Sequence, residues 1–309
     1  SGGHGGGSSS SVSTINVKVT DKDGKNVTVS KTISGDKVTL LLPNGTILDG
    51  NNYYTITVTD RTGKAKADTE VVLKDKNDNS ASGITDENGQ LILPAIKHKA
   101  YIVGYEDGEF KPENNMTRAE AAAIFARNIA ELKGETITSS KSSFTDVEQS
   151  KWYSGYIAYL EKYKVIDGYD DKTFRPEGHI TRAEFVAMCE RFFKLNNEMK
   201  YSQNNKFNDV LSSHWAYNYI NNASEMNWIS GYADGSFKPD SRITRAEVVT
   251  IVNRVTGRYA DVEYINKNMS SVNRFKDMKD KSYWGFYSVI EASREHTAAV
   301  ADNDESWVK

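Results

Sequence analysis

The fold is decided by a stretch that reads Gly231-Tyr232-Ala233-Asp234-Gly235-Ser236-Phe237-Lys238-Pro239 and then Ile243-Thr244-Arg245-Ala246-Glu247. The same pattern occurs over residues 168–184 and again over residues 104–120. We call its two parts the G-Y turn and the T-R-A-E segment. A pattern that returns at nearly constant spacing indicates repeated structural units that stack on one another and share a core.

A second pattern, which we call the F-x-D segment, alternates with the first, and a tryptophan follows each copy. The copies read Phe144-Thr145-Asp146-Val147 with Trp152, Phe207-Asn208-Asp209-Val210 with Trp215, and Phe275-Lys276-Asp277-Met278 with Trp284. The first T-R-A-E segment lacks an F-x-D segment before it, and the last F-x-D segment lacks a G-Y turn after it. We therefore expect the segment from Phe275 onward to complete the first repeat and close a ring. A swapped dimer is the alternative.

Each T-R-A-E segment predicts the start of a helix. A threonine followed three residues later by a glutamate forms a capping box, and an apolar residue before the threonine adds a hydrophobic staple. Periodicity predicts that each helix has one buried face. These faces contain Ile124, Phe125 and Leu132; Phe185, Met188, the single cysteine Cys189 and Phe192; and Val248, Ile251, Val252 and Val255.

Arg118, Arg182 and Arg245 occupy the first position of the three helices. A cation there opposes the helix dipole, whereas the free N–H groups at the same end attract anions. An arginine beside a helix N-terminus can therefore form an anion-binding site. The alternative is an ion pair within the chain, for instance to Asp107, Asp171 or Asp234.

The tryptophans and the aspartates of the F-x-D segments also have two interpretations. Trp152, Trp215 and Trp284 come early in amphipathic stretches, which predicts core packing with at most one indole edge beside a sugar groove. The aspartates are predicted to cap helices or stabilise turns, and these are Asp146, Asp209 and Asp277.

Together the motifs resemble the S-layer homology domain of bacterial surface proteins, over about residues 97–309. The resemblance implies a pseudo-threefold α-helical trimer of repeats within one chain. It also implies anchoring to secondary cell-wall polymers, typically through pyruvylated N-acetylmannosamine, and hence an extracellular place in the cell wall or S-layer. One departure is Lys172, which stands where the other turns have glycine and predicts a middle turn of different shape.

We accordingly expect a non-catalytic, glycan-binding site without cofactors. The candidate glycan-binding residues are Arg118, Arg182, Arg245, Asp107, Asp171, Asp234, Trp152, Trp215 and Trp284. No catalytic constellation can be assembled from the motifs, and the spacing of the histidines gives no zinc signature, so no metal site is expected. Two alternatives stay open: an anchoring fragment of a larger polysaccharide-degrading enzyme, and an adhesin whose β-domain binds proteins.

The residues before 97 predict a different kind of domain. Short β-branched stretches alternate with glycine-containing turns, which is typical of an all-β sandwich over residues 12–96. The stretches are Ile15–Thr20, Val27–Thr32, Val38–Leu42, Tyr53–Thr59 and Thr69–Leu73. The turns are Asp23-Gly24, Asn44-Gly45, Asp49-Gly50, Thr62-Gly63 and Asn88-Gly89. The segment Asp86–Pro94, with its Asn-Gly turn before a closing strand, resembles bacterial immunoglobulin-like modules.

Composition narrows the class of partner. A formal net charge of -3 argues against a nucleic-acid surface. No apolar run is long enough to predict a membrane span. Residues 1–11 form a Gly/Ser-rich stretch that predicts a flexible linker. The expected partners are therefore a secondary cell-wall polysaccharide and, as a further candidate, neighbouring S-layer subunits.

Overall fold

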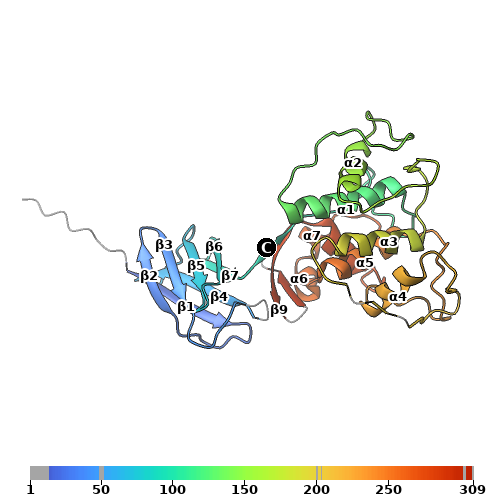
Figure 1. Ribbon diagram of the computed structural model, residues 1–309. Helices are drawn as coiled ribbons and strands as arrows, with labels where there is room; N and C mark the ends of the chain where they lie inside the picture. Colours follow the sequence, from blue (N-terminus) through green and yellow to red (C-terminus); the bar gives the residue numbers. More distant parts are fainter. Residues whose placement is uncertain (1–13, 49–51, 200, 203, 302–303, 308–309) are drawn as a thin grey trace, which may run out of the picture. The chain divides into compact units, whose positions relative to one another are not determined.

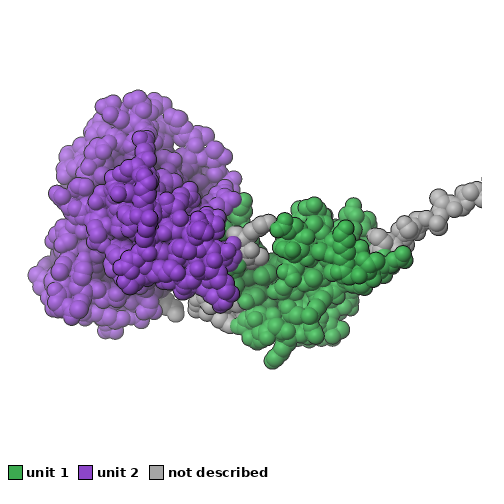
Figure 2. Space-filling model, turned by 180° about the vertical axis from the view of Figure 1, so that it is seen from behind, with its two compact units in different colours: residues 1–98, 296–309 green, residues 99–295 purple. Residues whose placement is uncertain are grey.

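A computed structural model describes residues 14–48, 52–199, 201–202, 204–301 and 304–307 of the 309-residue chain (Figure 1). The predicted linker over residues 1–11 and the predicted turn at Asp49-Gly50 lie outside the described residues. The chain forms two compact units, which Figure 2 colours separately. The β-rich unit contains the described residues up to His98 and those from His296 onward, and the helical unit spans Lys99–Glu295.

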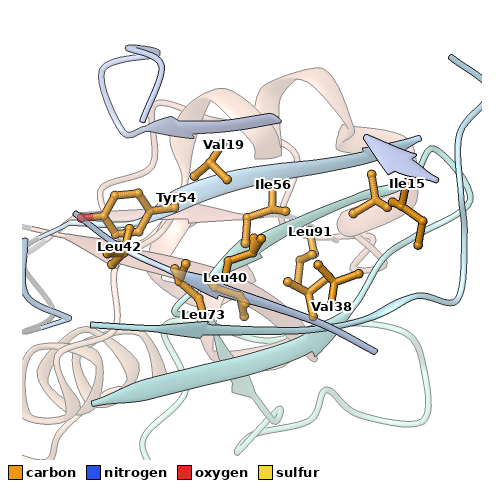
Figure 3. Close-up of a cluster of buried hydrophobic side chains, with 12 residues drawn as sticks. Ile15, Val19, Val38, Leu40, Leu42, Tyr54, Ile56, Leu73 and Leu91 are labelled. Atoms are coloured by element: carbon orange, nitrogen blue, oxygen red, sulfur yellow. The ribbon is translucent and has the colours of Figure 1, made fainter. Parts of the chain in front are cut away.

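Two sheets of the β-rich unit share one apolar core. The first is antiparallel, in the order β1 (Ile15–Asp21), β4 (Tyr54–Asp60), β7 (Gln90–Leu93). The second has the order β2 (Ser30–Ser34), β3 (Lys37–Leu41), β5 (Glu70–Lys74), β6 (Ser80–Ile84), and only β3 and β5 run parallel. Side chains from both sheets, such as Val19, Ile56 and Leu40, meet between them (Figure 3). Alternation along β3, β4 and β5 places every second residue in this core.

A third sheet of the β-rich unit joins residues that are far apart in the sequence. Its order is β10 (Asp304–Trp307), β9 (His296–Ala301), β8 (Ile96–His98), and all its pairs are antiparallel. The sequence placed residues 296–309 with the helical region, whereas in the structure β9 pairs with β8 and β10 pairs with β9. Periodicity cannot reveal such a pairing, because β8 and β9 are separated in the sequence by the whole helical unit.

The helical unit contains three long helices that begin at the T-R-A-E segments and three shorter helices that follow the F-x-D segments. The long ones are α1 (Arg118–Lys133), α3 (Arg182–Phe193) and α5 (Arg245–Thr256). The shorter ones are α2 (Ser154–Lys162), α4 (Tyr217–Glu225) and α8 (Phe286–Ser293), with α6 (Val262–Lys267) and α7 (Met269–Val272) between α5 and α8. The pairs that pack are α1 with α2, α3 with α4, and α5 with α8.

All three predicted capping boxes are present. The residues that precede them, Met116, Ile180 and Ile243, are fully buried, as a staple requires. Cys189 is buried as expected, and burial raises the pKa of its thiol. The expectation for Leu132 is wrong: its side chain is exposed, because it lies in the last turn of α1, beyond the buried stretch of that helix.

Each F-x-D segment fixes a G-Y turn. Asp146 accepts hydrogen bonds from the backbone N–H groups of Phe174 (2.8 Å) and Arg175 (2.7 Å). Asp209 and Asp277 do the same for the third and first turns, so these aspartates stabilise turns. The segment at Phe275 thus contacts the first turn, although the helix that follows it, α8, packs against α5.

The three G-Y turns share a left-handed residue at the position of Lys172. Its φ of 63° lies in the same left-handed region as the values for Gly108 (82°) and Gly235 (78°). The expectation of a different middle turn at this position is therefore wrong. Lys172 adopts the left-handed backbone conformation, although it is unfavourable for a residue with a side chain. The first glycine of each turn is needed for close packing, since a Cβ on Gly168 would lie 2.2 Å from the ring of Phe144.

Among the residues that the structure describes, no helix combines the length and apolar character that a membrane span requires.

Candidate functional site: three grooves in the helical unit

The arginine of each T-R-A-E segment reaches the G-Y turn of another repeat. Arg118 donates from Nε to the carbonyl oxygen of Phe174 at 2.7 Å. Arg182 makes the equivalent bond to Phe237 at 2.8 Å, and Arg245 returns to Phe110, in the first turn, at 2.9 Å. Each repeat is therefore bonded to the next, and the third repeat to the first.

The three arginines are buried and paired with carboxylates. They are 3–7% exposed, and they contact the glutamates of neighbouring capping boxes rather than aspartates. The pairs are Arg118 with Glu184 at 3.0 Å, Arg182 with Glu247 at 2.6 Å and Arg245 with Glu120 at 3.3 Å. The alternative interpretation, an ion pair within the chain, is therefore confirmed, but the partners are glutamates rather than Asp107, Asp171 or Asp234. Those aspartates pair with the cations four residues later in their own turns, which are Lys111, Arg175 and Lys238.

A tyrosine of the G-Y turn completes each cluster. The guanidinium carbon lies 4.7 Å from the ring centroids of Tyr105, Tyr169 and Tyr232 in the three repeats. The hydroxyls of Tyr169 and Tyr232 donate to Glu184 (2.7 Å) and Glu247 (2.9 Å). Burial raises the pKa of both tyrosines, and these bonds add to the rise, so the phenols remain neutral donors.

Each arginine forms the floor of a groove. The first groove lies between the first G-Y turn and α1, and contains Arg245 and Trp152. The second lies between the second turn and α3, and contains Arg118 and Trp215. The third lies between the third turn and α5, and contains Arg182 and Trp284. Their volumes are about 210, 630 and 540 Å³ respectively.

The tryptophans are groove residues, so the prediction that they are mainly core is wrong. Trp152, Trp215 and Trp284 are 57%, 57% and 58% exposed. Trp152 precedes the first residue of α2 by two positions, and the same offset holds for Trp215 and Trp284. Helical periodicity therefore does not apply to these residues, and the buried face of α2 is formed by residues such as Ile157 and Leu160.

A second arginine contributes to each groove, and the sequence analysis missed it. Arg127, Arg191 and Arg254 line the first, second and third grooves. Each lies nine residues after the arginine of its T-R-A-E segment, so its threefold recurrence was the signal that could have found it. By contrast, Asp107, Asp171 and Asp234 do not line any of these three grooves.

The second arginines have different partners. Arg127 donates to the carbonyl of Tyr101 at 3.1 Å, and Arg254 donates to the carbonyl of Trp228 at 3.1 Å. Arg191 instead forms an ion pair with Asp167, with 2.7 Å between Nη2 and Oδ2. The position of Asp167 is occupied by Val103 in the first repeat and by Ser230 in the third. Among the residues that the structure describes, the second groove is therefore the one whose second arginine is paired with a carboxylate.

The family comparison fits this geometry. The S-layer homology domain family matches residues 92–122, 143–186 and 206–249. The chain carries three S-layer homology domain segments. Each matched segment contains one G-Y turn and the beginning of one T-R-A-E helix, so the buried arginines lie within the matched segments, whereas Trp284 and the second arginines of the grooves lie outside them.

The chain is also similar to several named cell-surface proteins and enzymes. The chain is 34% identical over 221 residues to cell surface glycoprotein 1 of Acetivibrio thermocellus, covering 69% of the chain and 9% of that protein. It is 32% identical over 210 residues to a cellulosome-anchoring protein of the same organism, covering 68% of the chain and 45% of that protein. An amylopullulanase of Thermoanaerobacterium thermosulfurigenes is 29% identical over 180 residues, covering 57% of the chain and 9% of the enzyme.

The chain thus spans less than half the length of each of these relatives. An S-layer protein of Bacillus licheniformis also matches, with 32% identity over 174 residues. The family and these cell-surface relatives point to an extracellular, cell-wall-associated protein.

Proposed function

We propose that this chain anchors a surface protein to the bacterial cell wall by binding a secondary cell-wall polysaccharide in the three grooves. The S-layer homology segments and the anchoring and S-layer relatives support wall attachment. In this proposal the repeats form a pseudo-threefold trimer within one chain, the segment that begins at Phe275 completes the first repeat through its contacts with the first G-Y turn, and the chain contributes binding rather than catalysis. The two sheets before β8 act as an immunoglobulin-like spacer.

The observation that carries the proposal is the combination of a buried arginine and a largely exposed tryptophan in every groove. A tryptophan that is more than half exposed is available to stack on the apolar face of a sugar ring. The arginine beneath it is held in place by its Nε bond and its glutamate, so little side-chain entropy is lost when it binds a ligand. Such a pairing recognises a sugar that carries a negative charge.

The ligand that suits this site is pyruvylated N-acetylmannosamine. The pyruvate ketal presents one planar carboxylate on a sugar, and a guanidinium matches a carboxylate in geometry as well as charge. Because Glu120, Glu184 and Glu247 partly neutralise the buried arginines, the second arginines Arg127, Arg191 and Arg254 supply the additional positive charge.

The test is sedimentation of the chain with purified cell walls before and after acid extraction of the secondary polymer. We expect binding only to the walls that retain the polymer. Joint substitution of Trp152, Trp215 and Trp284 by alanine should abolish this binding without lowering stability, since these side chains are exposed. Tyr201→Ala is the matched control, because Tyr201 is 71% exposed and lies outside the three grooves. Equal binding to extracted walls would contradict the proposal.

A second candidate follows from the amylopullulanase match. That enzyme is similar to this chain over only 9% of its length, so the match identifies a shared module within a longer protein. In this case the chain is the anchoring part of a polysaccharide-degrading enzyme. The sequence of the whole gene distinguishes the two candidates, and an assay of this chain on wall polysaccharide should detect no release of reducing ends.

A further inference from the structure

In the part of the chain that the structure describes, one group of side chains is arranged so that it could hold a metal ion: His98, His296 and Glu305. These residues come from the three strands of the sheet β8–β9–β10 in the β-rich unit. His98 and His296 face each other in the register of β8 and β9. The sequence gives no sign of this group, because the histidines become neighbours only when the chain folds.

The atoms that bind metals converge on a small volume. Glu305 Oε1 lies 3.1 Å from Nε2 of His98, and Glu305 Oε2 lies 3.5 Å from Nε2 of His296. One ligand atom from each of the three residues lies within 4.8 Å of the others. Ligands bound tetrahedrally to zinc at about 2.0–2.1 Å are about 3.3 Å apart. Small side-chain movements would therefore bring all three residues to zinc-binding distances.

The group is shielded from solvent. The side chains of Glu305 and His296 are 0% exposed, and that of His98 is 13% exposed. Trp307 stacks on the ring of His296, with the centroids 3.8 Å apart and the planes inclined by 17°. Burying a carboxylate is costly unless positive charge accompanies it, and a divalent cation supplies that charge. The stacked indole also restricts the orientation of the imidazole, so this ligand is preorganised.

The ligand types distinguish among metals. Two imidazoles and one carboxylate are typical ligands of zinc, whereas calcium and magnesium prefer sites built of oxygen atoms. We propose that His98, His296 and Glu305 form a zinc site that links β8, β9 and β10. The chain enters the helical unit just after His98 and leaves it just before His296. The ion therefore links β8, which precedes the helical unit in the sequence, to β9, which follows it.

The site is separate from the glycan proposal, because none of its residues lines one of the three grooves. Its loss should change the stability of the β-rich unit and leave the residues of the grooves unaltered. The alternative is a buried histidine–glutamate cluster that binds no metal. Direct measurement of bound metal separates the two.

The experiment uses the whole chain, freed of any affinity tag and treated with a chelator. After addition of Zn²⁺ and desalting, we expect about one zinc per chain by elemental analysis. Co²⁺ should give the visible absorption of a tetrahedral site. His98→Ala, His296→Ala and Glu305→Gln should each weaken zinc binding by about a hundredfold or more, since removing even a residue behind a ligand costs 10–100-fold. Zinc should raise the melting temperature of the unsubstituted chain but not of these variants.

His214→Ala is the matched control, because Nε2 of His214 also lies 3.4 Å from a carboxylate oxygen, on Asp240, but that carboxylate is 83% exposed. The control should bind zinc normally. Retention of zinc by His98→Ala at the level of this control would overturn the proposal. The absence of bound zinc or cobalt in the unsubstituted chain would also overturn it, and that measurement holds even if a variant fails to fold.

Discussion

The second and third grooves have the same architecture but opposite charge. The second contains two arginines and four carboxylates, which are Arg118 and Arg191 with Asp167, Asp170, Glu184 and Asp240. The third contains three arginines and two carboxylates, which are Arg182, Arg242 and Arg254 with Glu113 and Glu247. The buried arginine, its glutamate and the turn tyrosine are the same in both.

The difference arises at positions that do not build the fold. Asp167 and Asp170 of the second repeat correspond to Ser230 and Ala233 of the third, and Arg242 adds the remaining charge to the third groove. The side chain of Asp167 is 68% exposed, so its ion pair with Arg191 adds little to stability, although it reduces the charge available to a ligand. The residues that build the grooves are thus the same in the two repeats, whereas the net charge of the residues that line each groove differs. If the grooves bind an anionic glycan as proposed, the glycan should bind more tightly in the third groove than in the second, because the third has more arginines and fewer carboxylates.

The largest expected effect on glycan binding comes from removing the second arginine of the third groove. Arg254→Ala should weaken glycan binding there by about 10–100-fold, because a hydrogen bond to a charged group contributes about 1.5–3 kcal/mol. Arg191→Ala should weaken the second groove far less, since Asp167 already pairs with that arginine. The indole N–H signals of Trp284 and Trp215 in an NMR titration report the two grooves separately. Equal losses would contradict the charge comparison.

An exchange of the two charge-determining residues should reverse the preference. Ser230→Asp should weaken the third groove by about tenfold, and Asp167→Ser should strengthen the second by a similar factor, which corresponds to about 1.4 kcal/mol. Ser230→Asn serves as the control of equal size without charge. The same indole signals measure the result. If Ser230→Asp and Ser230→Asn behave alike, shape rather than charge determines the preference.

The smallest effect concerns the turns beside the two grooves. Gly235→Ala should lower the free energy of unfolding by about 1 kcal/mol, because the backbone at φ 78° is left-handed and alanine is strained there. Lys172→Ala should change it little, since one strained residue replaces another at φ 63°. Chemical denaturation measures both. A large loss for Lys172→Ala would show that the lysine side chain, rather than the backbone, stabilises this turn.

The sequence predicted the features that depend on local chemistry. The capping boxes at Thr117, Thr181 and Thr244 and most strands of the two larger sheets were found because propensity and spacing determine them. Strand β6 was missed because Ser80, Ser82 and Gly83 give it no apolar alternation. The second predicted stretch, Val27–Thr32, is shifted in the structure, where β2 spans Ser30–Ser34.

The site was harder to predict because its contacts are not local. Arg118 is bonded to Phe174 and Glu184, and neither partner can be inferred from the helix that contains the arginine. Trp152 was expected in the core because its segment is amphipathic, but it precedes the helix to which that periodicity applies. Sequence periodicity thus identifies a buried face within an element, whereas the groove is formed by the packing of separate repeats.

The most direct test of the glycan-binding account is calorimetric titration of this chain with a wall disaccharide that carries a pyruvate ketal, alongside the same disaccharide without the ketal. The grooves place arginines beneath exposed tryptophans, so the carboxylate should be essential. We predict saturable binding of the ketal form and at least about tenfold weaker binding of the other, the difference expected from losing one charge-assisted contact. Equal affinity for the two sugars would contradict the account.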